Sequence, residues 1–290
     1  MDRAAEGVGQ AWCIFGMHRP AGLAKHGVMT EILQQSIPHD AHAPRPLPGI
    51  APLDPAEWLV VDEVFGAQMA ERAHLLKERR DEVLAVTPEG RAAADELLVF
   101  VLDWLTRHGE GYDIGEDEVV RPDGVRVALR RDDPMFTLGH LVQEDLCLME
   151  KRGDEHVLSA AVLCFPASWR LGDKIGRPLT AIHVPVPEYD EGLARRVQRL
   201  FDGVQVGRPL WRFNALRYAE PDLFQPCPRV APLYEDRLDA EGGDAVPYLR
   251  SERQCVLRLP ETRACVFSIH SYVIRAPGQV ESGTTSRSIV

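Results

Sequence analysis

A short stretch in the middle of the chain contains the residue types that could bind an iron-containing cofactor. His183 lies among apolar residues, and one aromatic and three basic residues come shortly before it: Trp169, Arg170, Lys174 and Arg177. A non-covalently bound haem needs such a set, because apolar side chains cover the porphyrin, a neutral nitrogen binds the iron and basic side chains pair with the propionates. The stretch is therefore compatible with a haem site in which His183 binds the iron, but taken alone a histidine beside an apolar patch is more often a hydrogen-bonded core residue.

Motifs for several other chemistries do not occur in the sequence. It contains no GxGxxG or Walker A loop for nucleotides, no GxSxG nucleophile elbow, no HExxH zinc motif and no CxxCH for covalent haem attachment. The six cysteines have no CxxC spacing, and four of them lie in apolar, strand-like runs. We therefore expect buried, reduced thiols, with no iron–sulfur cluster, zinc site or disulfide framework.

The composition is that of an ordinary globular protein. The 290 residues are 45% hydrophobic and 27% charged, which is enough to bury a substantial core. A formal net charge of −11 argues against a general nucleic-acid-binding surface, which needs clustered Lys and Arg. No apolar run is long enough to span a bilayer, and the first residues lack the apolar core of a signal peptide. The sequence therefore predicts a soluble, cytoplasmic protein.

Residues 1–46 are expected to form an irregular or disordered extension. Five prolines around His39 and His42 exclude a regular helix there, because proline lacks the amide donor and clashes with the preceding turn. For the two histidines, a solvated linker is a better explanation than a metal site. The last residues are rich in Gly, Ser and Thr, so we expect one folded domain over residues 47–275 and a disordered tail over residues 276–290.

Three stretches have the apolar spacing of amphipathic helices. Apolar residues recur every three or four positions in Gln68–Val86, Ala92–Trp104 and Tyr189–Phe201. The first two precede all the strand candidates, so they predict an N-terminal helical extension. A shorter helical turn is expected over Trp169–Ile175, where Gly176 ends it.

Five apolar runs are typical of β-strands. The runs are Leu141–Met149, Val157–Phe165, Pro209–Tyr218, Tyr248–Leu259 and Ala264–Ile274. Charged or proline-containing breaks join the first two and the last two as hairpins. The sequence thus predicts an α+β fold in which helices flank a five-stranded antiparallel sheet. The order of a two-strand hairpin, a helical segment and a three-strand meander resembles a PAS domain.

The segment LCFPASWRLGDKIGRPLTAIHVPVPEY, residues 163–189, is similar to the signature of the haem-dependent oxidative N-demethylase family. The stretches from Val142 to Leu148 and from Glu252 to Pro260 are also similar, and the resemblance covers about residues 47–272. It implies a PAS-like haem b protein that uses dioxygen to oxidise an N-methyl group, with formaldehyde and a smaller amine as products. It also implies that partner proteins deliver electrons. His183 lies in the segment from which haem-binding PAS sensors supply their iron ligand.

One motif departs from the family pattern. The family's Arg-x-Asn-Trp-Ser reads Arg212-Phe-Asn214-Ala215-Leu216 here. The resemblance makes Arg212 and Asn214 candidates to contact a distal ligand or the substrate, and Arg212 the candidate to assist cleavage of the O–O bond. The changed Trp and Ser positions imply a pocket of different shape and a different amine substrate.

Three more polar residues have two interpretations each. His270, where the family more often has Arg, lies in the last strand candidate. It is either a distal catalytic group that points into a PAS-type cavity or, as the strand pattern favours, a half-exposed residue on the wet face. Glu144 and Asp145 lie near a strand start, where a turn or surface role is favoured over general acid–base chemistry.

These observations predict a haem b-dependent oxidation of a small-molecule amine by dioxygen, with electrons from an external reductase or redox partner. His183 would hold the iron, and Trp169, Arg170, Lys174 and Arg177 would contact the haem. Three alternatives have the same fold: a haem-based sensor, another N-oxidation or C–N bond reaction, and a non-catalytic PAS-like subunit.

Overall fold

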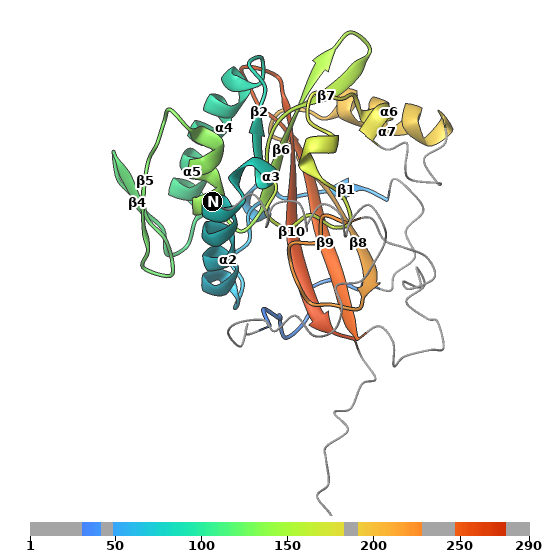
Figure 1. Ribbon diagram of the computed structural model, residues 1–290. Helices are drawn as coiled ribbons and strands as arrows, with labels where there is room; N and C mark the ends of the chain where they lie inside the picture. The colour runs from blue at the N-terminus through green and yellow to red at the C-terminus, as the bar shows by residue number, and fades with distance from the viewer. Residues whose placement is uncertain (1–30, 42–48, 183–190, 228–246, 277–290) are drawn as a thin grey trace, which may run out of the picture.

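The computed structural model describes residues 31–41, 49–182, 191–227 and 247–276. Seven strands form one antiparallel sheet with the order β1-β8-β9-β10-β6-β7-β2 (Figure 1). Their bounds are Ala51–Pro52 for β1, Leu84–Val86 for β2, Asp145–Arg152 for β6, Glu155–Val162 for β7, Leu210–Tyr218 for β8, Tyr248–Arg258 for β9 and Cys265–Arg275 for β10. The fold is α+β, as predicted.

The five strands expected from the sequence are β6 to β10, and all five lie side by side in this sheet. The expected number of strands is wrong, because β1 and β2 extend the sheet to seven. A second sheet of three strands contains β3 (Asp113–Ile114), β4 (Glu118–Val120) and β5 (Arg126–Ala128). All five unexpected strands have two or three residues, which is too short for an alternating pattern to appear in the sequence.

Eight helical segments accompany the sheets in the described part of the chain. They are η1 (Pro55–Glu57), α2 (Phe65–Glu78), α3 (Arg80–Val83), α4 (Arg91–His108), α5 (Pro134–Leu141), η2 (Leu171–Asp173), α6 (Leu179–Ile182) and α7 (Glu191–Gly203). The helix expected to run as far as Val86 ends at Glu78. The chain then forms α3 and enters the sheet as β2, where Leu84 pairs with Val162 of β7. No described helix is both long enough and apolar enough to cross a membrane.

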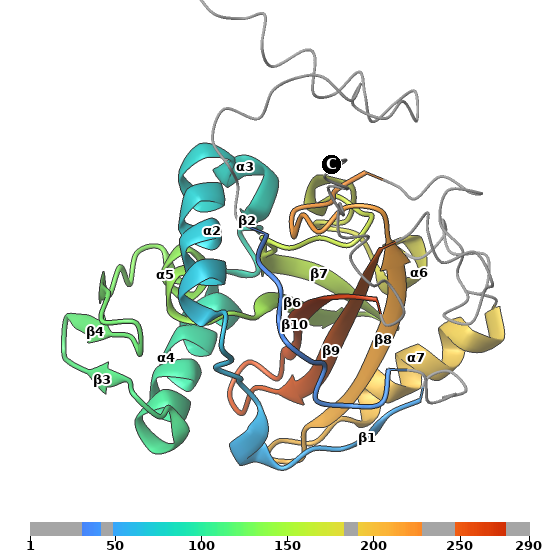
Figure 2. The ribbon, with the colours of Figure 1, turned by 90° about the horizontal axis from the view of Figure 1, so that it is seen from below.

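The two faces of the large sheet are covered by different helices. Helices α2, α4 and α5 lie on one side, and α6 and α7 lie on the other (Figures 1 and 2). Strand alternation directs each side chain to one of them. In β10, Val266 and Ser268 point to the first face, whereas Phe267 and Ile269 point to the second. The sheet therefore separates two hydrophobic clusters.

Residues 31–41 have no regular secondary structure, but they are packed along the sheet (Figure 2). The Gln34 amide donates to the Val273 carbonyl over 2.9 Å, and the His39 ring lies 4.2 Å from the Phe213 ring, centre to centre. His39 Nε2 is also 2.8 Å from Ser251 Oγ. The expectation that His39 belongs to a solvated linker is therefore wrong. His42 lies outside the described residues.

Candidate functional site

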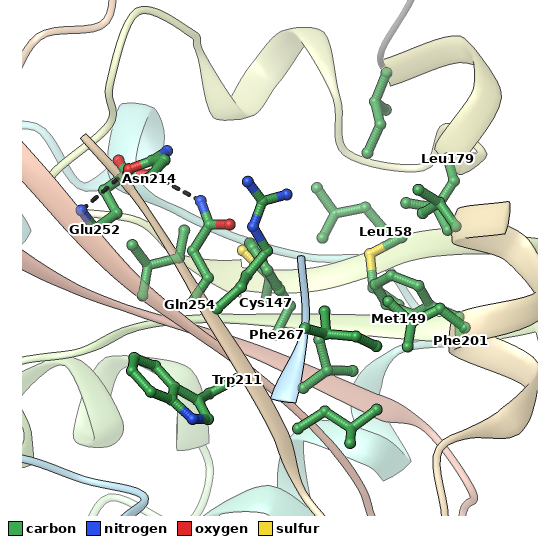
Figure 3. A pocket seen from close by; sticks show the side chains of 18 of the residues that line it. Cys147, Met149, Leu158, Leu179, Phe201, Trp211, Asn214, Glu252, Gln254 and Phe267 are labelled. Carbon is green, nitrogen blue, oxygen red and sulfur yellow. Dashed lines mark hydrogen bonds between the residues drawn. The ribbon is translucent and has the colours of Figure 1, made fainter. Parts of the chain in front are cut away.

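A cavity of about 380 Å³ lies on the face of the sheet that α6 and α7 cover (Figure 3). Its volume is within the range of about 300–1,000 Å³ that is typical of small-molecule and cofactor sites. One part of its wall is apolar and includes Met149, Leu158, Leu179, Ile182, Val197, Phe201 and Leu210. Strands β6 to β10 all contribute lining residues and supply its floor, and α6 and α7 supply its cover.

The other end of the cavity is polar and is built on β8 and β9. Glu252 Oε2 accepts hydrogen bonds from Asn214 Nδ2 over 3.0 Å and from Gln254 Nε2 over 2.9 Å (Figure 3). Asn214 is the direct cross-strand partner of Glu252, and its Oδ1 accepts from the Glu252 amide over 3.1 Å. These bonds fix the orientation of the Glu252 carboxylate. Arg250 Nη2, 3.8 Å from Glu252 Oε1, supplies an opposite charge.

Two cations in the cavity lack such a partner. Lys174 Nζ lies 4.2 Å from the centre of the Trp169 ring, which is a cation–π contact. Arg212 Nε is buried without a hydrogen-bond partner. Burial lowers the pKa of both residues, because it disfavours their charged forms. Among the described residues, neither forms an ion pair, so the cavity is suited to a ligand that carries carboxylates.

The structure brings together four of the residues that the sequence singled out. Trp169, Lys174, Arg212 and Asn214 all line the cavity. Arg170 and Arg177 are not among its lining residues, and Arg177 is exposed.

His183 lies outside the described residues, but it follows Ile182, which lines the cavity. Ala215 and Leu216, where the family motif is changed, do not line the cavity, so this change does not itself reshape the described wall.

His270 is on the opposite face of the sheet from this cavity. Its side chain is 1% exposed, with Nε2 at 3.2 Å from Asp62 Oδ2 and Nδ1 at 3.2 Å from Glu144 Oε1. Burial opposes the charge of the imidazolium, but the hydrogen bonds with Asp62 and Glu144 outweigh it and raise the pKa of His270 to about 9. The structure therefore places His270 neither in the cavity nor at a half-exposed position.

Glu144 and Asp145 are also buried, so the expected turn or surface role is wrong. Asp145 Oδ1 lies 2.6 Å from Arg72 Nη1 in an ion pair whose side chains are 0% and 1% exposed. The carboxylate of Asp145 also accepts hydrogen bonds from the backbone amides of Cys164 and Phe165. Asp145 therefore joins α2 to the end of β7.

The sequence interpretation assigned no role to Glu252 and Gln254, although both lie in the stretch that resembles the family. All five residues from Arg250 to Gln254 are polar, so no alternation in the sequence distinguishes Glu252 and Gln254. Only the position of β9 in the sheet shows that these two side chains face the cavity, because successive residues of a strand point to opposite faces.

None of the six described histidines lines the cavity. They are His39, His74, His108, His140, His156 and His270. His140 Nδ1 lies 2.9 Å from the Phe136 carbonyl within its own helix. Four of the six cysteines are buried and free, as expected, and one of these, Cys147, lines the cavity. Cys227 is exposed and disulfide-bonded, so the expectation of a reduced thiol is wrong for this residue.

A comparison with known protein families adds an independent finding. The model of a family described as haem-dependent oxidative N-demethylase, alpha subunit-like, matches residues 49–287. The matched region includes every strand of both sheets and all the residues that line the cavity.

Proposed function

The chain belongs to the haem-dependent oxidative N-demethylase alpha subunit-like family, and from this premise we propose that it oxidises an N-methylated amine with haem b and dioxygen. The cavity supports this proposal most directly, because it combines an apolar wall with two basic side chains, Lys174 and Arg212, that form no ion pair among the described residues. Haem b has the complementary character, since it is an apolar disc with two carboxylates at one edge.

The charges at the polar end fit such a ligand. Glu252 lies 3.8 Å from Arg250, and it also attracts Lys174 and Arg212 from a longer distance, but neither Lys174 nor Arg212 forms an ion pair with a described carboxylate. Buried charges are stable only when they are paired, so two carboxylates are the complement of these two cations. We assign Lys174 and Arg212 to the two propionates. This assignment replaces the distal role that the resemblance implied for Arg212.

His183 is the proposed iron ligand. None of the described histidines lines the cavity, and Ile182, which precedes His183, is part of the apolar wall. A neutral imidazole nitrogen is a common axial ligand of haem iron. Asn214, Glu252 and Gln254 then form the polar wall that orients the amine.

The bound haem would supply the iron that activates dioxygen. Removal of one N-methyl group consumes one dioxygen, two electrons and two protons, and yields formaldehyde, the shortened amine and water. In this proposal the two electrons come from an external donor. The "alpha subunit-like" description of the family is consistent with a partner subunit in this role.

A PAS-like arrangement is part of the proposal. The hairpin β6–β7, the helical segment with α6 and α7, and the meander β8–β9–β10 form one sheet, with β10 beside β6. This layout supports the PAS-like prediction for the central five strands, around which β1 and β2 are additions.

The test is the absorption spectrum of the purified protein in ferric, ferrous and carbon monoxide-bound states. We expect a Soret band in the wild type that is lost or shifted in His183→Ala and unchanged in His74→Ala, which removes an exposed histidine of α2. A wild type without a Soret band after hemin is supplied would overturn the proposal. An unchanged band in His183→Ala would overturn the ligand assignment alone.

Turnover is tested separately, by formaldehyde release from N-methylated amines in the presence of dioxygen and a reductant. Formaldehyde in proportion to the oxygen consumed is the expected result. A haem protein that releases no formaldehyde from a broad set of amines would instead be a haem-based sensor.

A further inference from the structure

A second cavity, of about 160 Å³, lies on the other side of the large sheet. Its wall comes from the segment after η1, the C-terminal end of α4 and the residues that lead into β6. The side chains that matter here are Val61, Trp104, His108, Glu110, Tyr112 and Glu144. None of the residues that line this cavity lines the first one, so it is a separate feature of the fold.

Glu144 is the buried polar residue of this cavity. Its Oε1 accepts a hydrogen bond from the Val60 amide over 2.8 Å and lies 3.2 Å from His270 Nδ1. Its Oε2 is buried and has no hydrogen-bond partner, although the side chain is only 1% exposed. A proton on Oε2 would not satisfy it, because that proton would have no acceptor. Buried polar atoms are almost always paired, so this oxygen points to a ligand.

The nearby cations do not satisfy Glu144 Oε2. His270 lies between Oε1 and Asp62, and Arg72 pairs with Asp145. Arg253, which is opposite His270 in the neighbouring strand, donates to the carbonyls of Glu57 and Trp58. The positive charge that Oε2 lacks must therefore come from outside the described residues.

The polar groups around the cavity are mainly acceptors. Tyr112 Oη gives its proton to the Leu141 carbonyl over 2.8 Å, so only its lone pairs remain. Trp104 Nε1 gives its proton to the Pro55 carbonyl over 2.7 Å. Glu110 adds a carboxylate, no Lys or Arg is among the described lining residues, and His108 is the one imidazole among them. A ligand that only donates, which is a cation, matches this lining best.

We propose that this cavity binds a small ammonium ion, with Glu144 Oε2 as its main acceptor and Tyr112 Oη as the second. The rings of Trp104 and Tyr112 line the same space and favour an organic or inorganic ammonium through cation–π attraction. The small volume admits ammonium or methylammonium and excludes bulky amines. The inference stands on this cavity alone and does not depend on the haem proposal.

The experiment measures the thermal midpoint and the binding isotherm of the full chain with ammonium chloride and methylammonium chloride, at an ionic strength held constant with sodium chloride. We expect a saturable rise in midpoint with both ammonium salts, and no rise with sodium chloride alone. In Glu144→Gln, the side-chain oxygen can still accept the hydrogen bond from the Val60 amide and lie near His270. The negatively charged oxygen that faces the cavity is then replaced by a neutral amide group. It should weaken ammonium binding at least tenfold.

A second variant tests the site independently, in case Glu144→Gln does not fold. Val61→Phe enlarges a side chain that is 47% exposed on the cavity wall and should also weaken binding. The matched control is Val99→Phe, which enlarges a 59% exposed valine of α4 that does not line the cavity, and it should bind as the wild type does.

Three outcomes would overturn the inference. Equal stabilisation of the wild type and Glu144→Gln would show that the effect does not come from this site. Binding of potassium without binding of either ammonium salt would assign the site to a metal ion. Absence of any saturable cation effect would show that the cavity holds water only.

Discussion

The two faces of the large sheet differ in whether their charged side chains form ion pairs. On the face that α2, α4 and α5 cover, Arg72 pairs with Asp145, and the His270 ring lies between two carboxylates. On the face that α6 and α7 cover, Lys174 and Arg212 line a cavity and have no described ion pair. Because an unpaired buried charge is costly, a ligand would complete the charges of the second, unmatched face, whereas the internal ion pairs of the first, matched face stabilise the fold, although Glu144 Oε2 on that face is also unpaired.

The covering elements explain the difference. Helices α2 and α4 have 14 and 18 residues, and they fill their face with a continuous apolar core. Helix α6 has only four residues, and α7 is separated from it by a segment outside the described residues. A short cover leaves space between the sheet and the helices, and that space is the cavity.

The largest expected effect is on the matched face, at the pair of Arg72 and Asp145. Replacement of Arg72 by Met leaves the Asp145 carboxylate buried without its cation, which typically costs about 3–5 kcal/mol of the free energy of unfolding. Urea denaturation followed by circular dichroism measures this loss. The comparison variant Arg126→Met breaks an exposed ion pair with Glu118 and should cost less than about 0.5 kcal/mol. Similar losses in the two variants would contradict the distinction between buried and surface pairs.

The same pair shows what the sequence could and could not predict. The long strands β6 to β10 were predicted to within a few residues, because each is an apolar run with turn residues at both ends. Asp145 was placed at a turn or on the surface, because its partner Arg72 is 73 positions away and no local pattern joins them. His270 and Glu144, 126 positions apart, were misjudged for the same reason. Pairings between distant segments depend on the tertiary fold.

The cavity was predictable in part. Trp169 and Lys174 cluster within a few positions, and this local signal placed them correctly. Glu252 and Gln254 become part of the same site only because β9 pairs with β8 across a gap of about forty residues. Arg170 and Arg177 have the same charge as Lys174 and are its close neighbours in sequence, and only the structure separates them from the lining residues.

The second effect concerns the pH dependence of the matched face. The pKa of His270 is raised to about 9, above an ordinary value of 6.5, by its two carboxylates. Its contribution to stability is therefore complete below about pH 6.5 and is lost as the pH rises through 9, with a total of about 3 kcal/mol from the size of the shift. We expect the wild type to lose this stability between pH 6 and pH 10 in urea titrations.

His270→Gln should be less stable at pH 6 and should have a flatter stability profile over the same range. His74→Gln changes an exposed histidine and should keep the wild-type slope. A wild-type profile that stays flat to pH 10, or a slope that survives in His270→Gln, would show that the imidazolium does not hold Asp62 and Glu144 together.

The smallest effect on stability is expected on the unmatched face, and this effect tests most directly whether the two faces differ. Lys174→Met with Arg212→Met removes two half-buried cations that form no described ion pair, so it relieves their desolvation and loses one cation–π contact. The net change in the free energy of unfolding without haem should be below about 1 kcal/mol.

The affinity for hemin, measured by titration of the Soret band, should fall at least tenfold, because each charged hydrogen bond to a propionate is worth about 1.5–3 kcal/mol. A large loss of stability with unchanged hemin affinity would mean that Lys174 and Arg212 hold the fold together, as Arg72 does, and the two faces would then be alike. Unchanged stability with weakened hemin binding would establish that Lys174 and Arg212 bind a ligand and do not stabilise the fold.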